Sequence, residues 1–404
     1  MKITAIICEY NPMTNGHTRH MSIAREETGA DTILSVMSGS FVQRGDAAIV
    51  DKYIRATSAI VMGSDIVVEL PTIYAISPAD NFAYGALKTI SAFKDVEYIS
   101  FGSECGDINT LQKVADLLYN EPESFSLELQ ANLKQGYSYP KSRALATAKY
   151  VEENPDFSDI AGILDEPNNV LGVSYLTAIK KLGLNIKAHT IKREGGGYND
   201  DSITSAYPSA TAVRQAIRRG ELDKMKESVP NVVYESLRNM SKNNDSLNDM
   251  MLFKIKSLNG YDLEHYYDVT GGIHNRIKIA AINATSLEQM LEQAKTKNYT
   301  MARLKRICLY SLFDITQKMY EESVAAPLHV SILAIKKSRK KELLSSLAES
   351  CPNVLTKYSD IHKVDKAVRP LIKLDFISQG TLEIINRANY LNKKMIIIDD
   401  KITE

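Results

Sequence analysis

The first twenty residues constrain the fold more than any other stretch of the chain. The β-branched run over residues 3–7 (ITAII) predicts a buried strand, which cannot continue past Pro12 because proline has no N–H to give to a sheet. Residues 14–17 (TNGH) then predict a turn into a helix. Gly16 lets the backbone pass close to a ligand, and His17 falls in the first helical turn, where unpaired N–H groups favour an anion. The stretch therefore predicts a strand, an anion-binding turn and a helix in succession.

The following strands extend this pattern over residues 1–220. Continuous apolar runs separated by helical patterns predict an α/β fold with a doubly wound, Rossmann-like parallel sheet, covered on both faces. The predicted strands after the first are residues 32–37, 66–70, 98–101 and 186–191, and the predicted helices between them include residues 51–62, 79–93 and 171–182. Ligands of such sheets bind beyond the carboxyl ends of the strands. The loops expected there are residues 8–17, 38–46, 71–78, 102–105 and 192–209.

The remaining chain predicts two further parts. Residues 107–159 are polar and helical in pattern, and they interrupt the strands, so we interpret them as an insertion. Residues 221–322 also predict helices, whereas residues 329–335 and 395–398 predict short strands around two helices. We therefore predict an α/β domain over residues 1–220 and a helical, partly α/β C-terminal region over residues 221–404.

Composition limits the class of protein. The 404 residues carry no net charge and are 44% hydrophobic, and no apolar run approaches the roughly 18 residues of a membrane span. The first strand follows Lys2 directly, without the layout of a signal peptide. The four cysteines are scattered and form no CxxC pair (Cys8, Cys105, Cys308 and Cys351). We therefore expect a cytoplasmic protein without a metal site of its own and without a membrane partner.

A second motif supports the first. Residues 209–214 (SATAVR) open a predicted helix, with Ser209 as its N-cap. Alone, this pattern is more typical of a capped amphipathic helix with a surface arginine. Its pairing with residues 14–17, in this order and at a second strand-to-helix junction, favours a phosphate site shared by the two helices.

The chain resembles the nucleotidylyltransferase superfamily in these two motifs, and no Walker loop is present. More specifically, it resembles the tRNA(Met) cytidine acetate ligase family. That resemblance is carried by residues 9–17, 37–46, 51–52, 69–71, 101–104, 167–169 and 191–193. It implies that ATP and acetate form acetyladenylate, whose acetyl group is transferred to the wobble cytidine of elongator tRNA(Met). ATP with Mg²⁺, acetate and tRNA are the ligands implied, with no protein partner. The resemblance also implies that residues 1–220 form the ATP-binding catalytic domain and that residues 221–404 form the tRNA-binding region.

The resemblance also implies site residues. Thr14, His17 and Arg214 are the expected catalytic groups. Many members of the superfamily have histidine where this chain has Thr14, so we expect any charge at this point to rest on His17. The expected ATP-binding residues are Ile7, Cys8, Glu9, Tyr10, Asn11, Pro12, Asn15, Gly16, His20, Gly102, Asn168, Asn169, Arg193, Ser209 and Thr211.

Acetate needs a small pocket near the α-phosphate. The loop after the second strand is the candidate, through Ser38, Gly39, Ser40 and Arg44. Arg44 fits equally a surface charge of a loop. Lys52 and Arg55 lie on one helical face and fit a solvated surface as well as a functional role. The strand-end acids Glu69 and Glu104 either position magnesium or structure a loop, and the sequence leaves that choice open.

The last part of the chain is basic. Residues 331–404 hold fourteen Lys and Arg against nine Asp and Glu, and five of these cations are Lys336, Lys337, Arg339, Lys340 and Lys341. Such a run is more often a solvated helix face, and the alternative is a contact with RNA phosphates. A surface around Arg303, Lys305 and Arg306 is a second candidate for that contact.

Two other functions share the phosphate site. A small-molecule adenylyltransferase of cofactor biosynthesis does not need the long region after Arg214. A non-catalytic RNA-binding protein that senses a nucleotide does not need the intact His17 and Arg214. Both features favour the RNA-modifying ligase. The identity of the RNA and its base, the acid and the oligomeric state do not follow from the residue chemistry.

Overall fold

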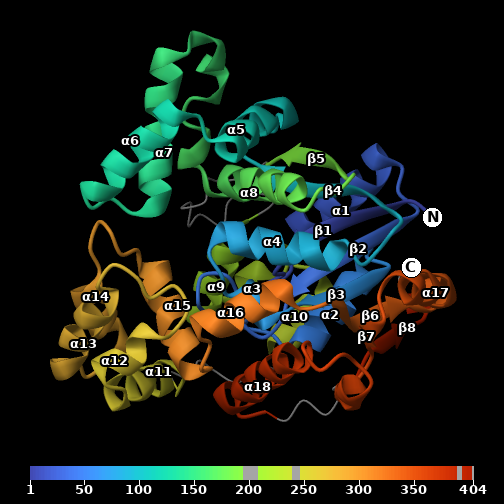
Figure 1. Cartoon of the computed structure of the whole chain (residues 1–404). Helices are drawn as coiled ribbons and strands as arrows, with labels where there is room; N and C mark the ends of the chain where they lie inside the picture. The colour runs from blue at the N-terminus through green and yellow to red at the C-terminus, as the bar shows by residue number, and fades with distance from the viewer. Residues whose placement is uncertain (194–207, 239–245, 389–393, 403–404) are drawn as a thin grey trace.

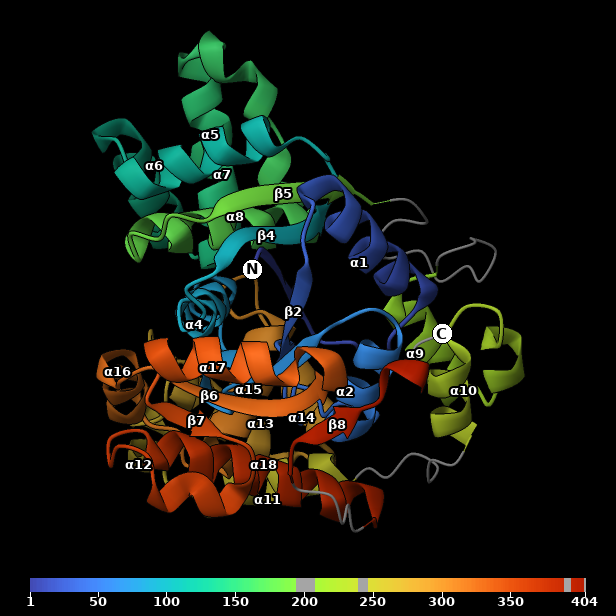
Figure 2. The ribbon, with the colours of Figure 1, turned by 90° about the vertical axis from the view of Figure 1, so that its right-hand side faces the viewer.

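A computed structural model describes residues 1–193, 208–238, 246–388 and 394–402. The strands of this part form one sheet in the order β5-β4-β1-β2-β3-β6-β7, with β8 paired to β6 (Figures 1 and 2). The strands are β1 (Ile3–Cys8), β2 (Thr32–Ser38), β3 (Ile66–Leu70), β4 (Val96–Ser103), β5 (Lys187–Lys192), β6 (His329–Lys336), β7 (Asn353–Leu355) and β8 (Ile396–Ile398). Strands β1 to β5 are parallel to one another, which confirms the predicted doubly wound α/β fold.

Helices cover both faces of the sheet because the strands are apolar on both sides. Up to residue 238, and apart from the insertion described below, the α-helices are α1 (Asn15–Thr28), α2 (Lys52–Val61), α3 (Thr72–Ala75), α4 (Ala79–Ile90), α8 (Pro167–Lys181), α9 (Ala210–Arg218) and α10 (Asn231–Arg238). One core lies between the sheet and α1, α2, α9 and α10, around Ile33 and Met37. The other core lies on the opposite face, where α4 packs on β2 and β3 and α8 packs on β4.

The predicted insertion is helical and follows β4. It consists of α5 (Ile108–Asn120), α6 (Glu123–Lys134), α7 (Tyr139–Glu153) and two 3₁₀ segments, η1 (Pro155–Ile160) and η2 (Ile163–Asp165). In Figure 1 it lies at the upper left, above a second helical group at the lower left. That group comprises α11 (Ser246–Ser257), α12 (Gly260–Glu264), α13 (Ile273–Asn283), α14 (Leu287–Ala294), α15 (Met301–Leu312) and α16 (Gln317–Ala325). The two groups meet where Lys297 Nζ lies 4.8 Å from the centre of the Tyr137 ring.

The C-terminal strands belong to the same sheet as the N-terminal ones. The sequence predicts strands near residues 329–335 and 395–398, and β6 and β8 confirm them. Strand β6 pairs antiparallel with β3, so these strands extend the catalytic sheet instead of forming a sheet of a separate region. The remaining segments of this part are η3 (Leu222–Met225), η4 (Lys337–Arg339), α17 (Lys340–Ser350), η5 (Tyr358–His362), α18 (Arg369–Asn386) and η6 (Asp400–Ile402).

Helix α18 is held against the carboxyl ends of β2 and β3 by buried polar contacts. Gln379 donates to Asp51 Oδ2 over 2.6 Å and accepts from Ser40 Oγ over 2.8 Å. Asp375 Oδ1 accepts the Thr72 N–H over 2.6 Å. The C-terminal part of the chain therefore reaches the loop that follows β2.

Candidate nucleotide site

The site begins where β1 gives way to α1. Thr14 is the extended N-cap of α1, and its backbone N–H donates to His17 Nδ1 over 2.9 Å. The Thr14 hydroxyl lies 3.1 Å from the same nitrogen. Since Nδ1 accepts the backbone hydrogen bond, the neutral ring carries its proton on Nε2 and can donate it. Residues 14–17 thus combine a helix N-terminus with a fixed imidazole.

His17 is not a cation in this structure. Burial lowers the pKa of His17 to about 3, and the charge of Arg193 acts in the same direction. The sequence left any charge of this motif to His17, but its Nδ1 is occupied as an acceptor and Arg193 lies close enough to oppose a positive charge on the ring. A neutral Nε2–H donor remains.

The second motif lies beside the first. Ser209 is the N-cap of α9, as predicted, and its Oγ accepts the Ala212 N–H over 3.1 Å. Arg214, one turn further along α9, donates to the carbonyl oxygen of Asn11 over 2.7 Å and to Thr211 Oγ1 over 2.9 Å. The N-termini of α1 and α9 are thereby joined at the carboxyl end of β1.

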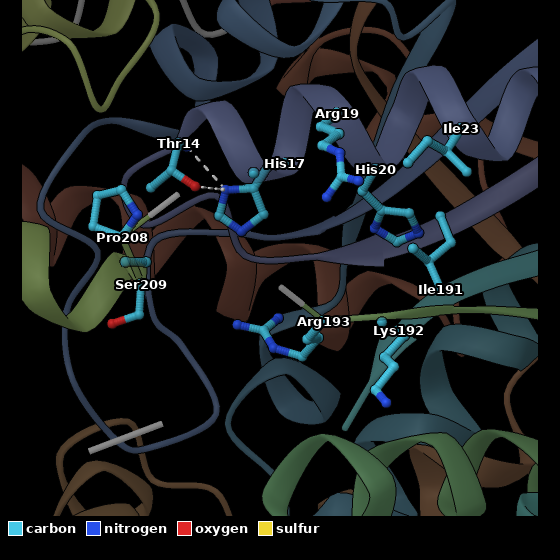
Figure 3. Close-up of a pocket in the computed structure, with 13 residues that line it drawn as sticks. Thr14, His17, Arg19, His20, Ile23, Ile191, Lys192, Arg193, Pro208 and Ser209 are labelled. Carbon is cyan, nitrogen blue, oxygen red and sulfur yellow. Dashed lines mark hydrogen bonds between the residues drawn. The ribbon is translucent and has the colours of Figure 1, made fainter. Parts of the chain in front are cut away.

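A cavity opens between these helices and the ends of β4 and β5. In Figure 3, Thr14 and His17 face Pro208 and Ser209, with Arg193 across the cavity. Its lining includes the predicted residues Thr14, Gly16, His17, His20, Gly102, Arg193 and Ser209. A Cβ added to Gly102 would lie 3.2 Å from Arg193 Cγ, so the glycine leaves room for this arginine. Arg19, Ile23, Ile191, Lys192, Pro208 and Ala210 complete the wall and were missed from the sequence.

Glu9 lies at the carboxyl end of β1 among arginines. Its carboxylate accepts the Gln43 N–H over 3.0 Å. Burial raises the pKa of Glu9, although the charges of Arg214, Arg55 and Arg44 act to lower it. Glu9 is therefore a buried acid that is surrounded by the cations of the site.

Arg55 fixes the ends of β1 and β2. Its guanidinium donates to the carbonyl oxygens of Glu9 over 2.7 Å, Ser38 over 2.9 Å and Gly39. Lys52, on the same helix, donates to both oxygens of Glu69 over 2.6 and 2.7 Å, and both side chains are about 95% buried. The solvated interpretation of Lys52 and Arg55 is therefore wrong.

Other predicted residues have structural partners. Glu104 accepts the Asn168 side-chain amide over 2.5 Å and the Asn169 N–H over 2.8 Å. Asn169 Oδ1 accepts the Glu104 N–H over 2.9 Å, so these three residues lock β4 to the start of α8. Asn15 is engaged with residues 227–228, to which it donates from Nδ2 and from its backbone N–H.

The residues before Thr14 pack against the turn that carries His17. Ile7 and Cys8 belong to β1, and burial raises the pKa of the Cys8 thiol to about 12. The buried Tyr10 ring meets the His17 ring edge-on, with the ring centres 5.2 Å apart, and Pro12 follows a cis peptide bond. Ser38, the last residue of β2, and Ser40 in the loop that follows are fully buried, while Arg44 in the same loop is exposed.

The fold and the paired helix N-termini define a nucleotidyl transferase, and a family model described as HIGH Nucleotidyl Transferase matches residues 1–395. The tRNA(Met) cytidine acetate ligase of Thermoanaerobacter sp. (strain X514) is 35% identical over 366 residues, 89% of each chain. The tRNA(Met) cytidine acetate ligase of Clostridium perfringens (strain ATCC 13124) is 34% identical and covers 99% of this chain and 98% of its own. The chain belongs to the tRNA(Met) cytidine acetate ligase family, which confirms the resemblance seen in its motifs.

A solved structure agrees with this assignment. The crystal structure of Thermotoga maritima TmcAL bound with alpha-thio ATP matches with a TM-score of 0.88 at 30% identity. The match covers 98% of this chain and the whole of that chain.

In the part of the chain that the structure describes, no helix is long and apolar enough to cross a membrane.

Proposed function

We propose that the protein is an ATP-dependent ligase that makes acetyladenylate and acetylates the wobble cytidine of elongator tRNA(Met). The contact of Arg214 with the carbonyl oxygen of Asn11 carries the proposal, because it brings both phosphate motifs to one strand end. The names of the relatives favour this function over a cofactor adenylyltransferase or a nucleotide sensor. The alpha-thio ATP in the Thermotoga maritima structure supports ATP as the nucleotide.

The first step needs positioning and charge more than proton transfer. An oxygen of acetate attacks the α-phosphorus of ATP, and pyrophosphate leaves with the electron pair of the broken P–O bond. Arg214 supplies positive charge, while His17 supplies a neutral donor and the N-termini of α1 and α9 supply N–H groups. Gly102 and Arg193 are proposed for the adenosine side of the cavity, with the other predicted ATP-binding residues around them.

Mg²⁺ is proposed to arrive with the triphosphate. The described residues include no group of three or more His, Cys, Asp or Glu side chains that could hold a metal. Mg²⁺ commonly binds through substrate phosphates and waters, with one or two carboxylates at most. Glu69 and Glu104 are engaged with Lys52 and residues 168–169, so the phosphates are the principal ligands in this proposal.

We propose the loop after β2 for acetate. Ser38 Oγ is buried and has no hydrogen-bond partner among the described residues. A buried hydroxyl without a partner is costly, so a carboxylate that accepts from it is favoured. Ser40 is a positioning residue in this proposal because its hydroxyl donates to Gln379, and Arg44 supplies charge at the exposed side.

We propose that residues 221–404 provide the surface that binds tRNA. We also propose that the enzyme is cytoplasmic. Lys305 approaches the site, since its Nζ lies 2.8 Å from Asp46 in the loop after β2. The run over residues 336–341 lies elsewhere: Arg339 donates to the carbonyl oxygen of Asp31, before β2 begins. Its role in RNA binding stays a prediction.

Two measurements test the function. Hydroxylamine added to protein, ATP and acetate should trap acetyladenylate as acetohydroxamate, and nucleosides of bulk tRNA should lose N4-acetylcytidine when the gene is deleted. Adenylyl transfer to pantetheine phosphate or nicotinamide mononucleotide, with none to acetate, would instead establish the small-molecule enzyme.

A further inference from the structure

A chain of hydrogen bonds leads from the cavity wall to the protein surface. His20 Nε2 lies 2.9 Å from Ser100 Oγ, which lies 3.0 Å from His189 Nδ1. His189 Nε2 lies 2.7 Å from Glu27 Oε2. His20 lines the nucleotide cavity (Figure 3), Ser100 is buried, and the Glu27 side chain is 60% exposed. Four residues from α1, β4 and β5 therefore connect the site with solvent.

The register of the sheet makes this chain possible. Ser100 on β4 is paired directly with His189 on β5, so both side chains lie on one face of the sheet. Helix α1 packs on this face and contributes His20 and, two turns later, Glu27. The chain is thus held by regular secondary structure at each position, which keeps its distances fixed.

Glu27 sets the direction of every hydrogen bond. An ionised carboxylate only accepts, so His189 carries its proton on Nε2 and accepts at Nδ1. Ser100 therefore donates to His189 and accepts from His20 Nε2. Neutral His20 is left with an unprotonated Nδ1, which makes it a base at the end of the chain nearest the cavity.

The surroundings of His20 oppose a lasting positive charge there. Burial lowers the pKa of His20 to about 4, and the charge of Arg193 adds to this effect. His17 on α1 lies beside it, the cationic Arg19 and Lys192 line the same cavity, and Lys187 precedes His189 on β5. A proton that reaches His20 is thus driven onward towards Glu27.

We propose that the His20–Ser100–His189–Glu27 chain removes the proton that the exocyclic amine of the wobble cytidine loses during acetyl transfer, a proposal that rests on the proposed function. The amine nitrogen bonds to the acetyl carbon, and the bond from that carbon to the phosphate oxygen breaks, with its electron pair leaving on AMP. The amine proton passes to His20 Nδ1. The Nε2 proton of His20 then passes to Ser100, the Ser100 proton to His189, and the His189 Nε2 proton to Glu27 and solvent.

The two half-reactions separate this role from nucleotide binding. Formation of acetyladenylate releases no proton from an amine, whereas acetyl transfer does. Acetate-dependent exchange of pyrophosphate into ATP measures the first step, and single-turnover transfer from acetyladenylate to tRNA measures the second. For Ser100→Ala we expect exchange within about twofold of wild type and transfer slowed about tenfold or more, since general acid–base groups contribute about a hundredfold or more.

Glu27→Gln tests the proton itself, because glutamine can still accept the hydrogen bond of His189 but cannot take its proton. We expect transfer to slow about threefold or more and its pH profile to change, while Glu26→Gln, at the exposed neighbouring position, matches wild type. Wild-type transfer in both Ser100→Ala and Glu27→Gln would overturn the proposal. Equal decreases in the rates of exchange and transfer for Ser100→Ala would also overturn the proposal, and would instead indicate that Ser100 positions ATP. Wild-type protein without acetate-dependent exchange would overturn the proposed function itself, and the chain's role with it.

Discussion

Arg214 and Asn11 are joined by a hydrogen bond of 2.7 Å that links the helix following residue 209 to the end of the first strand. The two residues are far apart in sequence, yet this contact sets the spacing between the two phosphate motifs. Arg214 also holds Thr211 over 2.9 Å, so its guanidinium is oriented before any nucleotide binds. Such preorganised charge lowers the cost of stabilising a transition state.

Removal of either motif's donor should lower turnover. We expect His17→Ala and Arg214→Ala each to slow acetate-dependent pyrophosphate exchange about a hundredfold or more at saturating ATP, because each removes a donor or a charge from the developing transition state. Arg218→Ala, at the exposed end of the same helix as Arg214, is the matched control and should remain near wild type. Near-normal exchange in both site variants would contradict the assignment.

The buried pair of Lys52 and Glu69 should dominate local stability. Glu69→Gln leaves the Lys52 ammonium without its charged partner inside the protein, which we expect to cost about 3–5 kcal/mol in the free energy of unfolding by urea. Glu349→Gln breaks the exposed pair with Lys94 and should leave the urea midpoint unchanged. Equal shifts of the urea midpoint in the two variants would show that burial does not increase the contribution of the Lys52–Glu69 pair to stability.

Asp375 should make stability depend on pH. Burial raises its pKa to about 7, helped by the charge of Glu69 and opposed by Lys52. The folded protein thus binds a proton that the unfolded chain releases near pH 3.8, so the stability contributed by this group is present at low pH and is lost as the pH rises towards 7.

Asp375→Asn should remove this dependence, since asparagine keeps an acceptor for the Thr72 N–H without a charge. We expect the variant to gain more stability relative to wild type at pH 8 than at pH 5, measured by urea unfolding at both pH values. An identical difference at the two pH values would contradict a raised pKa of Asp375.

Much of the fold was predictable because its signals are local. The apolar strand of residues 66–70, the N-cap at Ser209 and the glycine in the turn at residues 14–17 each need only their neighbours in sequence. The position of the ligand site followed from the rule that ligands bind at the carboxyl ends of parallel strands. The cavity between residues 14–20 and Ser209 lies at that edge.

The remainder depended on pairings that no local pattern contains. Strand β6 joins β3 in the antiparallel direction, and Ser100 faces His189 only because of the register between β4 and β5. The neutral state of His17 likewise follows from burial and a backbone donor, whereas its residue type alone suggested a cation. The burial of Arg55 against three carbonyl groups could not be predicted either, because these contacts join segments that are distant in sequence.

The last prediction compares two basic surfaces for tRNA. Three cations of the run over residues 336–341 already have acidic partners: Lys336 with Asp400, Lys337 with Asp399, and Arg339 with Glu342. Their charge is partly neutralised before RNA arrives. Reversal of Lys336, Lys337, Lys340 and Lys341 to Glu should therefore weaken tRNA binding only about threefold and leave acetyladenylate formation unchanged.

Lys305→Met tests the other surface, next to the loop after β2, without adding a repulsive charge near Asp46. Each lost phosphate contact removes about one unit or less from the slope of log affinity against log salt, so tRNA affinity measured at two salt concentrations should show such a decrease for Lys305→Met. A larger change of slope in the fourfold reversal than in Lys305→Met would assign the RNA contact to residues 336–341. An unchanged slope in both proteins would exclude both surfaces, because phosphate contacts cannot be lost without releasing fewer counterions.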